Sequence, residues 1–244
     1  MNIKNNTVLI TGGASGIGLA LALSLLEQNN TVIICGRNSD KLNQVLQKYP
    51  KLHIITCDIT IKQDREALLS HIQKEFPKLN MLINNAGIQH NYNFMDKTQH
   101  HNLIDEELSI NLNSQIKLID MFVEILSLQK SSCIVNITSA LAYVPKQSAP
   151  VYCASKAGFH VFTAALRYQL ENTSINVFEV IPALVDTPMT KGRGINKTSP
   201  EQLVSEVLRG LKTNTYEIKI GKAKFLLLLK RFIPSLANRI LKSA

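Results

Sequence analysis

The chain has 244 residues, of which 45% are hydrophobic, and its 27 Lys and Arg against 18 Asp and Glu give a formal net charge of +9. This length suits one α/β domain with a large core, and no stretch reaches the ~18 apolar residues of a membrane-spanning helix. Most of the excess charge falls after position 208, so the main body gives no reason to expect a nucleic-acid partner.

The chain enters a strand-like run within its first ten residues. This leaves no room for a signal peptide, and we expect a cytoplasmic protein. The cysteines are widely spaced, form no CxxC pair and lie mostly inside apolar strands, so we predict buried reduced thiols and no metal site. They are Cys35, Cys57, Cys133 and Cys153.

Short apolar runs alternate with helical patterns along the chain. The predicted strands are residues 7–11, 31–35, 52–56, 81–84, 133–138, 175–181 and 216–220. The predicted helices are residues 17–28, 40–48, 63–76, 106–129, 151–171 and 200–212. This order is typical of βαβ units and predicts an α/β fold, a single-domain Rossmann-like doubly wound parallel sheet of about seven strands with helices on both faces. We expect residues 1–221 to form a dinucleotide-binding domain with a built-in substrate site, and residues 222–244 to be a basic amphipathic tail of the same domain.

A glycine-rich turn joins the first predicted strand to the first helix, with the sequence Thr-Gly-Gly-Ala-Ser-Gly-Ile-Gly at residues 11–18. Glycines permit a tight turn and let backbone N–H groups approach a pyrophosphate, and the helix N-terminus behind them favours negative charge. The spacing differs from the common Gly-x-Gly-x-x-Gly fingerprint, and a purely structural turn is the alternative. Its place between a buried strand and an amphipathic helix predicts a phosphate site. The expected cofactor-binding residues here are Gly12, Ser15, Gly16, Ile17 and Gly18.

The end of the second strand bears on the choice of cofactor. A site that prefers NAD places an acid there to hold the ribose 2′-hydroxyl, but this strand is followed by Arg37. A guanidinium can form forked contacts with a 2′-phosphate, so we predict NADP(H), with NAD(H) as the alternative cofactor. The other interpretation is a solvated Arg. Ser15 adds no second basic residue to the phosphate turn.

Tyr152 and Lys156 stand four residues apart near the start of the predicted helix 151–171 and therefore share one helix face. A nearby ammonium favours the phenolate and lowers a Tyr pKa from its ordinary value of about 10. A pKa moved toward neutrality suits general acid–base catalysis. Taken alone, the pair also fits a surface helix with a solvated Lys.

With these motifs the sequence resembles the short-chain dehydrogenase/reductase family, and most of all a bacterial branch associated with D-alanine–teichoic acid genes. The resemblance covers about residues 5–190, in the family's order and spacing. The matching residues are the segment 11–18, Asp58, Asn84, Asn85, Ala86, Gly87, Asn111, Ser139, Tyr152, Lys156, Pro182, Thr187 and Pro188.

The resemblance implies roles for four catalytic residues. Tyr152 is expected to exchange a proton with a carbonyl oxygen, and Lys156 to lower the Tyr152 pKa and hold the nicotinamide ribose. Ser139 is expected to hydrogen-bond the carbonyl. Asn111 is expected to support a water that links Lys156 to solvent, the alternative being a polar residue on a solvated helix face.

The resemblance also implies the rest of the cofactor site. Asp58 and Ile59 follow the third strand, near the adenine, and Asn84, Ala86 and Gly87 follow the fourth, beside the adenine ribose. Pro182, Val185 and Thr187 are expected to border the nicotinamide carboxamide. The family usually has Pro-Gly where this chain has Pro182-Ala183, which puts the local loop geometry in question.

The predicted pocket wall is mostly apolar, which suggests a ketone or alcohol with apolar flanks. Its candidates are Gln89, His90, Ala140, Leu141, Tyr143, Val144 and Met189. The basic segment after Pro188, with Lys191, Arg193 and Lys197, is interpreted as a solvated lid rather than as an anion site.

The tail 222–244 is mostly apolar with Lys and Arg residues at intervals, and Pro234 divides it into two pieces. We expect it to cap the substrate cleft or to mediate association between subunits, with contact to an anionic membrane surface as the less favoured interpretation.

Three functions are compatible with these observations. The favoured one is an NADP(H)-dependent oxidoreductase that transfers a hydride between the nicotinamide and a small-molecule carbonyl or secondary alcohol, with Tyr152 as general acid/base. The alternatives are a same-fold epimerase and a non-catalytic NADP-binding regulatory protein. The resemblance implies a homodimer or homotetramer.

Overall fold

The computed structural model describes residues 1–96 and 99–242. Its centre is a seven-stranded sheet in the order β3-β2-β1-β4-β5-β6-β7, in which every pairing is parallel. The strands are β1 (Thr7–Thr11), β2 (Thr31–Gly36), β3 (His53–Thr56), β4 (Leu79–Asn84), β5 (Ser132–Ile137), β6 (Ile175–Pro182) and β7 (Glu217–Ile220). The doubly wound parallel sheet predicted from the sequence is confirmed.

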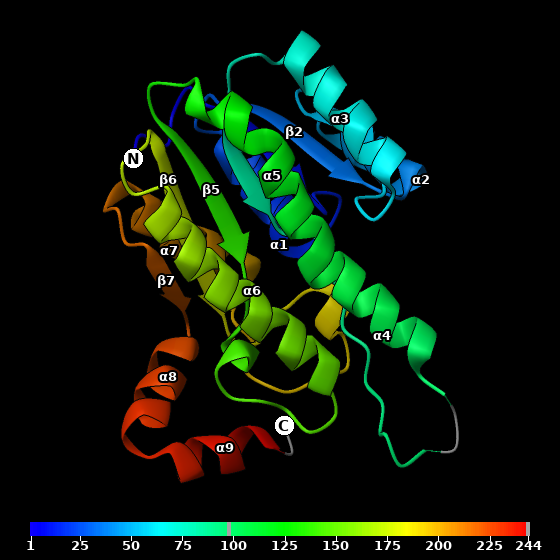
Figure 1. Ribbon diagram of the computed structural model, residues 1–244, viewed down its shortest axis with the longest axis vertical. Coiled ribbons are helices and arrows are strands. Elements are labelled where there is room, and N and C mark those ends of the chain that lie inside the picture. Colours follow the sequence, from blue (N-terminus) through cyan, green and yellow to red (C-terminus); the bar gives the residue numbers. More distant parts are fainter. Residues whose placement is uncertain (97–98, 243–244) are drawn as a thin grey trace.

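Two layers of helices cover the sheet, because alternate strand residues point to opposite faces. One face packs against α1 (Gly16–Leu26), α2 (Ser39–Lys48) and α7 (Pro200–Lys212), and the other against α3 (Lys62–Glu75), α5 (Ser114–Ser127) and α6 (Pro150–Gln169). In β1, Val8 and Ile10 join the first core and Leu9 the second. Figure 1 shows α3, α5 and α6 on the near side of the sheet.

The chain order reverses between β1 and β4, since β2 and β3 lie to one side of β1 and β4 to β7 lie to the other. Ligands of open α/β sheets bind outside the carboxyl ends of the strands at such a switch point. The glycine turn after β1 and the loop after β4 both start there. The fold therefore brings the predicted phosphate turn to the edge where Ser139 and Tyr152 also lie.

The predicted helix 106–129 is wrong as a single helix. The structure has α4 (His101–Leu108), a π-helical turn η1 (Ser109–Asn113) and then α5. The physical reason is Asn111, whose buried side chain bonds to the backbone of Ile88 on the loop after β4. Such a wide turn inside a helix often marks a functional position. Most other predicted boundaries differ from the structure by one or two residues.

The tail forms two short helices, α8 (Ala223–Phe232) and α9 (Pro234–Lys242), and Pro234 begins the second one as the sequence indicated. Both lie at the end of the molecule toward which β5, β6 and β7 run (Figure 1). The last two residues of the predicted tail lie outside the described part. Within the described residues, no helix combines the length and the apolar character that a membrane crossing requires.

We expect Gly12→Ala to lower the free energy of unfolding by about 1–3 kcal/mol, because Gly12 has φ +65 and a Cβ there would lie 2.9 Å from the Ala86 Cα. Gly36→Ala is the control, since nothing lies within 4 Å of its added Cβ. Urea unfolding measures both variants. Equal stabilities would show that the turn does not need glycine at position 12.

Candidate active site

The glycine turn packs closely against two other loops. A Cβ on Gly18 would lie 2.5 Å from the Asn85 Nδ2 and from the Gly12 carbonyl oxygen, and a Cβ on Gly16 would lie 3.4 Å from the Thr187 side chain. Gly12 N donates to the carbonyl of Cys35 at 2.8 Å, which fixes the turn to the end of β2. The loops after β1, β4 and β6 therefore meet in one place.

This meeting place fits a dinucleotide phosphate. Helix α1 begins at Gly16 with Ser15 as its N-cap, and the Ser15 side chain forms no capping hydrogen bond. The first turn of α1 also contains no acid, so no carboxylate of that turn would compete with an anion for its N–H groups and positive dipole end. The crowding around Gly12 and Gly18 is a cradle that any larger side chain would fill. Ile17, in the first turn of α1, is half-buried.

The residues expected to be catalytic come from three elements. Ser139 follows β5 and caps the short 3-10 helix η2 (Ala140–Ala142), where its Oγ accepts a hydrogen bond from Leu141 N. Tyr152 and Lys156 are buried on α6, which Pro150 initiates. Lys156 Nζ donates to the Ile137 carbonyl at 2.8 Å, directly at the end of β5. The structure thus brings Ser139, Tyr152 and Lys156 together.

Asn111 joins this group through the wide turn. Its Oδ1 accepts from Ile88 N, and its Nδ2 donates to the Ile88 carbonyl and to Ser155 Oγ. A Cβ on Gly87 would lie 3.3 Å from the Asn111 Oδ1 and 3.6 Å from the Lys156 Nζ, so the two side chains pack closely around this glycine. The alternative of a solvated helix face is wrong, since Asn111 is buried.

The electrostatics differ from the prediction. Burial raises the pKa of Tyr152 to about 12, and a hydrogen-bonding interaction with Ser139 opposes that shift. Burial lowers the pKa of Lys156 to about 8. The predicted lowering of the Tyr152 pKa is therefore wrong for this arrangement, because the ammonium turns toward the Ile137 carbonyl and lies 5.9 Å from the centroid of the Tyr152 ring.

Arg37 lies at the end of β2 and is half-exposed, as a 2′-phosphate ligand needs to be. Its Nη1 forms an ion pair with Glu106 Oε1 at 3.2 Å, and the other carboxylate oxygen of Glu106 lies 3.0 Å from the His90 Nε2. Arg37 is thus not a free solvated side chain, because it forms a defined contact with Glu106. An exposed pair of this kind is weak, so it leaves the guanidinium able to change partner.

The residues after β3 form a compact turn. Asp58 Oδ1 accepts from both the backbone N and the hydroxyl of Thr60, which orients one carboxylate oxygen. Ile59 is buried, and its carbonyl accepts from Arg65 Nη1 at 2.7 Å. The turn is rigid and keeps Asp58 partly accessible at the edge of the sheet.

Asn84 is not placed as predicted, because its side chain lies in the core. It is 1% exposed, and its Nδ2 donates to Asn136 Oδ1 at 2.9 Å. Ala86 and Gly87 remain at the switch point. Thr11 Oγ1 accepts from the backbone N of Asn85 and of Ala86, which fastens the loop after β4 to the glycine turn. The sequence analysis did not single out Thr11, although it opens the glycine motif.

The loop after β6 has no unusual backbone conformation at Ala183, where the family usually has glycine. Pro182 pairs with Ile220 of β7, and Ala183 is absent from the residues with positive φ. An alanine is therefore accommodated without strain, which answers the question raised by the missing glycine. Val185 bridges to Thr198, and Thr187 caps the 3-10 helix η3 (Pro188–Thr190) next to Gly16.

The prediction that Ala140 and Val144 line the substrate pocket is wrong. Ala140 and Val144 are buried in a third core with Ala223, Leu226 and Ala237, beneath the tail helices. The tail consequently covers the outside of η2, and these two side chains face it. Gln89, His90 and Leu141 are half-buried, while Met189 is exposed.

Two of the three basic residues after Pro188 are held in place, contrary to the interpretation as a solvated lid. Lys197 Nζ donates to the Thr190 carbonyl and pairs with Asp186 at 3.2 Å. Arg193 Nη2 reaches the Gln89 carbonyl at 3.4 Å, across from the loop after β4. Its Nη1 is buried and has no hydrogen-bond partner among the described residues. Only Lys191 is exposed as expected.

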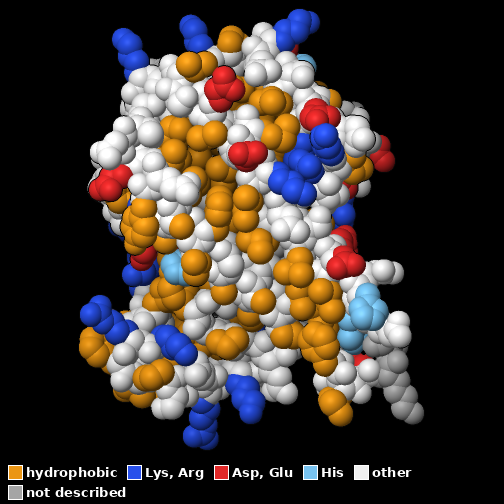
Figure 2. All heavy atoms as spheres, viewed as in Figure 1, with side chains coloured by type: hydrophobic (Ala, Val, Ile, Leu, Met, Phe, Trp, Pro, Cys, Tyr) orange, Lys and Arg blue, Asp and Glu red, His pale blue; other side chains and the backbone are white. Residues whose placement is uncertain are grey.

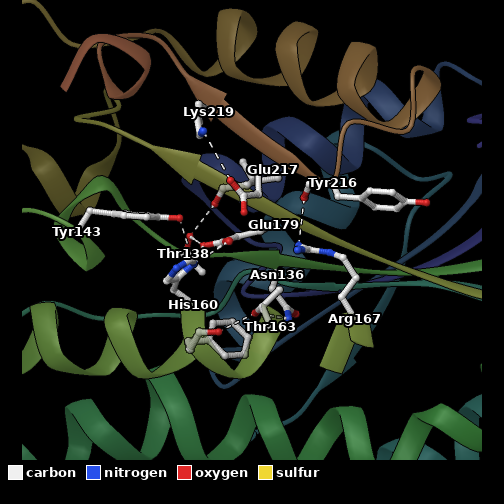
Figure 3. Close-up of polar contacts among 12 residues, drawn as sticks. Asn136, Thr138, Tyr143, His160, Thr163, Arg167, Glu179, Tyr216, Glu217 and Lys219 are labelled. Atoms are coloured by element: carbon white, nitrogen blue, oxygen red, sulfur yellow. Dashed lines mark hydrogen bonds and ion pairs between the residues drawn. The ribbon is translucent and has the colours of Figure 1, made fainter. Parts of the chain in front are cut away.

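A buried polar network that the sequence did not predict lies behind the residues expected to be catalytic. Glu179 on β6 is fully buried and accepts from Thr138 Oγ1 at 2.6 Å and from His160 Nδ1 at 2.9 Å. Tyr143 OH also contacts the same His160 nitrogen, at 3.1 Å. Figure 3 shows these side chains converging from β5, β6, α6 and the segment after η2.

The network ties the catalytic elements to one another. Thr138 directly precedes Ser139, and His160 stands one helical turn beyond Lys156 on α6. The hydrogen bond with Glu179 raises the pKa of His160, against the opposing effect of burial. A helix-spacing argument from Tyr152 and Lys156 could have indicated His160, but no sequence pattern pairs it with a glutamate 19 positions later.

We expect Glu179→Gln to lower the free energy of unfolding by about 1.5–3 kcal/mol near pH 6, because a hydrogen bond to a charged group is lost. The pKa of His160 is raised in the folded protein. The stability that protonated His160 contributes through Glu179 is therefore complete below the ordinary His pKa of about 6.5. It is lost as the pH rises through the His160 pKa of the folded protein.

The difference in free energy of unfolding between the wild type and Glu179→Gln should consequently become smaller from pH 6 toward pH 9 in denaturant titrations. Glu217→Gln on β7, a half-exposed neighbour, is the control and should change stability little. A gap that widens with rising pH would contradict the ion-pair assignment.

All four cysteines are buried, and burial raises the pKa of Cys57 to about 12. Among the residues that the structure describes, no three His, Cys, Asp or Glu side chains gather in a way that could hold a metal ion.

A sequence model of the short chain dehydrogenases matches residues 6–198. The chain belongs to the short-chain dehydrogenase family. Among its relatives, the oxidoreductase DltE of Bacillus subtilis (strain 168) is 42% identical over 224 residues, covering 89% of each chain. An oxidoreductase of Staphylococcus epidermidis is 28% identical over 193 residues, covering 78% of this chain and 82% of the relative. The relation to DltE confirms the predicted branch of this family.

Solved short-chain dehydrogenases share the fold. One from Burkholderia cenocepacia J2315, in complex with NADP, has a TM-score of 0.89 at 24% identity and covers 100% of both chains. Another, from Burkholderia phymatum in complex with NAD, has a TM-score of 0.87 at 17% identity, covering 100% of this chain and 98% of the other. At these identities the similarity shows the fold alone.

Proposed function

We propose that this short-chain dehydrogenase is an NADP(H)-dependent oxidoreductase acting on a carbonyl or secondary alcohol, with Tyr152 as general acid/base. The observation that carries the proposal is the convergence of Ser139, Tyr152, Lys156 and Asn111 beside the glycine cradle. A bound nicotinamide cofactor would supply or accept the hydride. The protein residues bind and orient the reactants and move the proton.

Each residue has a role that its surroundings support. Ser139 Oγ accepts from Leu141 N and interacts with Tyr152, and its one hydrogen can turn to a substrate oxygen placed between the two hydroxyls. Tyr152 holds its proton at neutral pH, because burial raises its pKa. It is therefore in the acid form that reduction of a carbonyl needs, and it can return to that form only by taking a proton from elsewhere.

Lys156 and Asn111 supply the route for that proton. The pKa of Lys156, lowered to about 8 by burial, lies near the working range of a proton relay. Asn111 occupies the space beyond Lys156 and Gly87, and its hydrogen bonds to Ile88 hold it there. We propose that protons reach Tyr152 through Lys156, from a water that Asn111 helps to hold.

The cofactor proposal rests on Arg37. The guanidinium stands after β2, and no acid occupies the tip of that strand. Its exposed pair with Glu106 is a contact that a 2′-phosphate would replace with a stronger charge-assisted one.

Partly buried Arg193 is expected to favour substrates that carry a hydrogen-bond acceptor near the carbonyl. Comparing the reduction rates of oxo acids with those of their esters tests this expectation. The homodimer or homotetramer and the cytoplasmic location remain predictions.

Replacing Tyr152 by Phe should reduce NADPH-dependent carbonyl reduction by at least about 100-fold, because the proton donor is removed. Absorbance at 340 nm with a panel of ketones and aldehydes measures the rate. Tyr168→Phe, an exposed tyrosine on the same helix, is the control. NADPH binding should persist in both variants. A Tyr152→Phe protein with the rate of the wild type would remove this residue from the mechanism and favour the regulatory alternative.

Arg37→Ala should weaken NADPH binding relative to NADH binding by about tenfold or more, since a charge-assisted contact is lost. Titration of each cofactor by fluorescence gives the ratio. Lys48→Ala removes the same charge from the far end of α2 and should leave the ratio unchanged. Glu106→Gln should shift the ratio toward NADPH by freeing Arg37. The same ratio in Arg37→Ala and wild type would contradict this assignment.

A further inference from the structure

The two tail helices bury part of their apolar surface against the body and leave another part exposed. The residues that they bury against the body are Ala223, Leu226 and Ala237. Their largest apolar side chains point outward, with exposures between 43% for Leu236 and 70% for Phe232. These outward residues are Phe225, Leu228, Phe232, Ile233, Leu236 and Ile240, which we call the tail face. An exposed apolar surface of this kind marks an interaction site.

Basic residues border the tail face without any acid. Residues 222–242 contain six Lys and Arg and no Asp or Glu, and four of the six are both exposed and outside the ion pairs described: Lys222, Arg231, Arg239 and Lys242. Arg231 lies 5.8 Å from the ring of Phe232, so charge and apolar surface adjoin. Figure 2 shows hydrophobic and basic side chains mixed over this end of the molecule.

The tail face is fixed to the body and to the active-site side. Lys230 Nζ donates to Asn238 Oδ1 at 2.8 Å and joins α8 to α9, and Lys224 pairs with Glu206 on α7. Gln147 N donates to the Lys242 carbonyl at 3.3 Å. This contact attaches the end of α9 to the segment that leads into Tyr152. Whatever binds the tail face is therefore held next to the catalytic edge of the sheet (Figure 1).

The charge pattern decides between possible occupants. A second copy related by two-fold symmetry would place this same face against itself, so its basic border would meet an identical basic border with no acid to offset the repulsion. An anionic lipid surface matches both features, because Phe and Leu enter the interface while Lys and Arg meet the headgroups. We propose that the tail face docks the enzyme on anionic membrane surfaces.

Vesicle flotation tests the proposal with the full-length protein. The wild type should float with vesicles of phosphatidylcholine mixed with phosphatidylglycerol, and should remain unbound with phosphatidylcholine alone. Phe225→Ser/Phe232→Ser and Arg231→Gln/Arg239→Gln should each reduce the bound fraction by about tenfold. Raised salt should weaken binding of the wild type, since surface charges are screened.

Leu128→Ser is the matched control, because Leu128 is 78% exposed but lies at the end of α5, away from the tail. It should bind as the wild type does. Thermal unfolding establishes that each variant is folded. Equal flotation of the wild type and both double variants would overturn the proposal. A second outcome would also overturn it: the wild type does not float, and light scattering shows a lower particle mass for Phe225→Ser/Phe232→Ser than for the wild type. That result would identify the tail face as a subunit interface.

Discussion

Parallel strand pairing is the constraint on which the site depends. Since β1, β4, β5 and β6 all run in one direction, the loops after them emerge at one edge of the sheet. The glycine turn, the loop that carries Gly87, Ser139 and the segment containing Thr187 thus meet there, although they are far apart in the chain. Glycine is required where these loops touch, since Gly12 and Gly18 each leave no room for a larger side chain.

Burial, rather than a neighbouring charge, governs the acid–base properties of this site. It moves the pKa of Tyr152 upward and that of Lys156 downward, so the two groups are driven toward their neutral forms. The Ile137 carbonyl accepts the hydrogen bond of the ammonium, which lies 5.9 Å from the centroid of the Tyr152 ring. Behind them, Glu179 links Thr138, directly after β5, to His160 on α6, which fixes the spacing between Ser139 and the helix that carries Tyr152 and Lys156.

The exterior of the molecule divides into parts with different tasks. Helices α1, α2, α3, α5, α6 and α7 bury apolar faces against the sheet, as layered folds require. Helices α8 and α9 instead attach themselves through Ala223, Ala237 and a few leucines, and leave other large apolar side chains exposed. They also cover Ala140 and Val144, so the same segment shields the back of η2 and offers a new surface.

Local patterns in the sequence were sufficient for the fold and for much of the site. Alternating strand and helix periods specify the layers. The glycine turn and the four-residue spacing of Tyr152 and Lys156 are visible in the sequence because their neighbours in space are also neighbours along the chain, but the catalytic role of that pair was predicted only once the family resemblance was added. What required the tertiary structure involves partners distant in sequence or the degree of burial. The wide turn at Asn111, the core position of Asn84, the pair of Arg37 with Glu106 and the network around Glu179 arise from contacts that chain order does not encode. The direction of the Tyr152 pKa shift belongs to the same class, since desolvation depends on everything packed around the phenol and spacing reports only one neighbour.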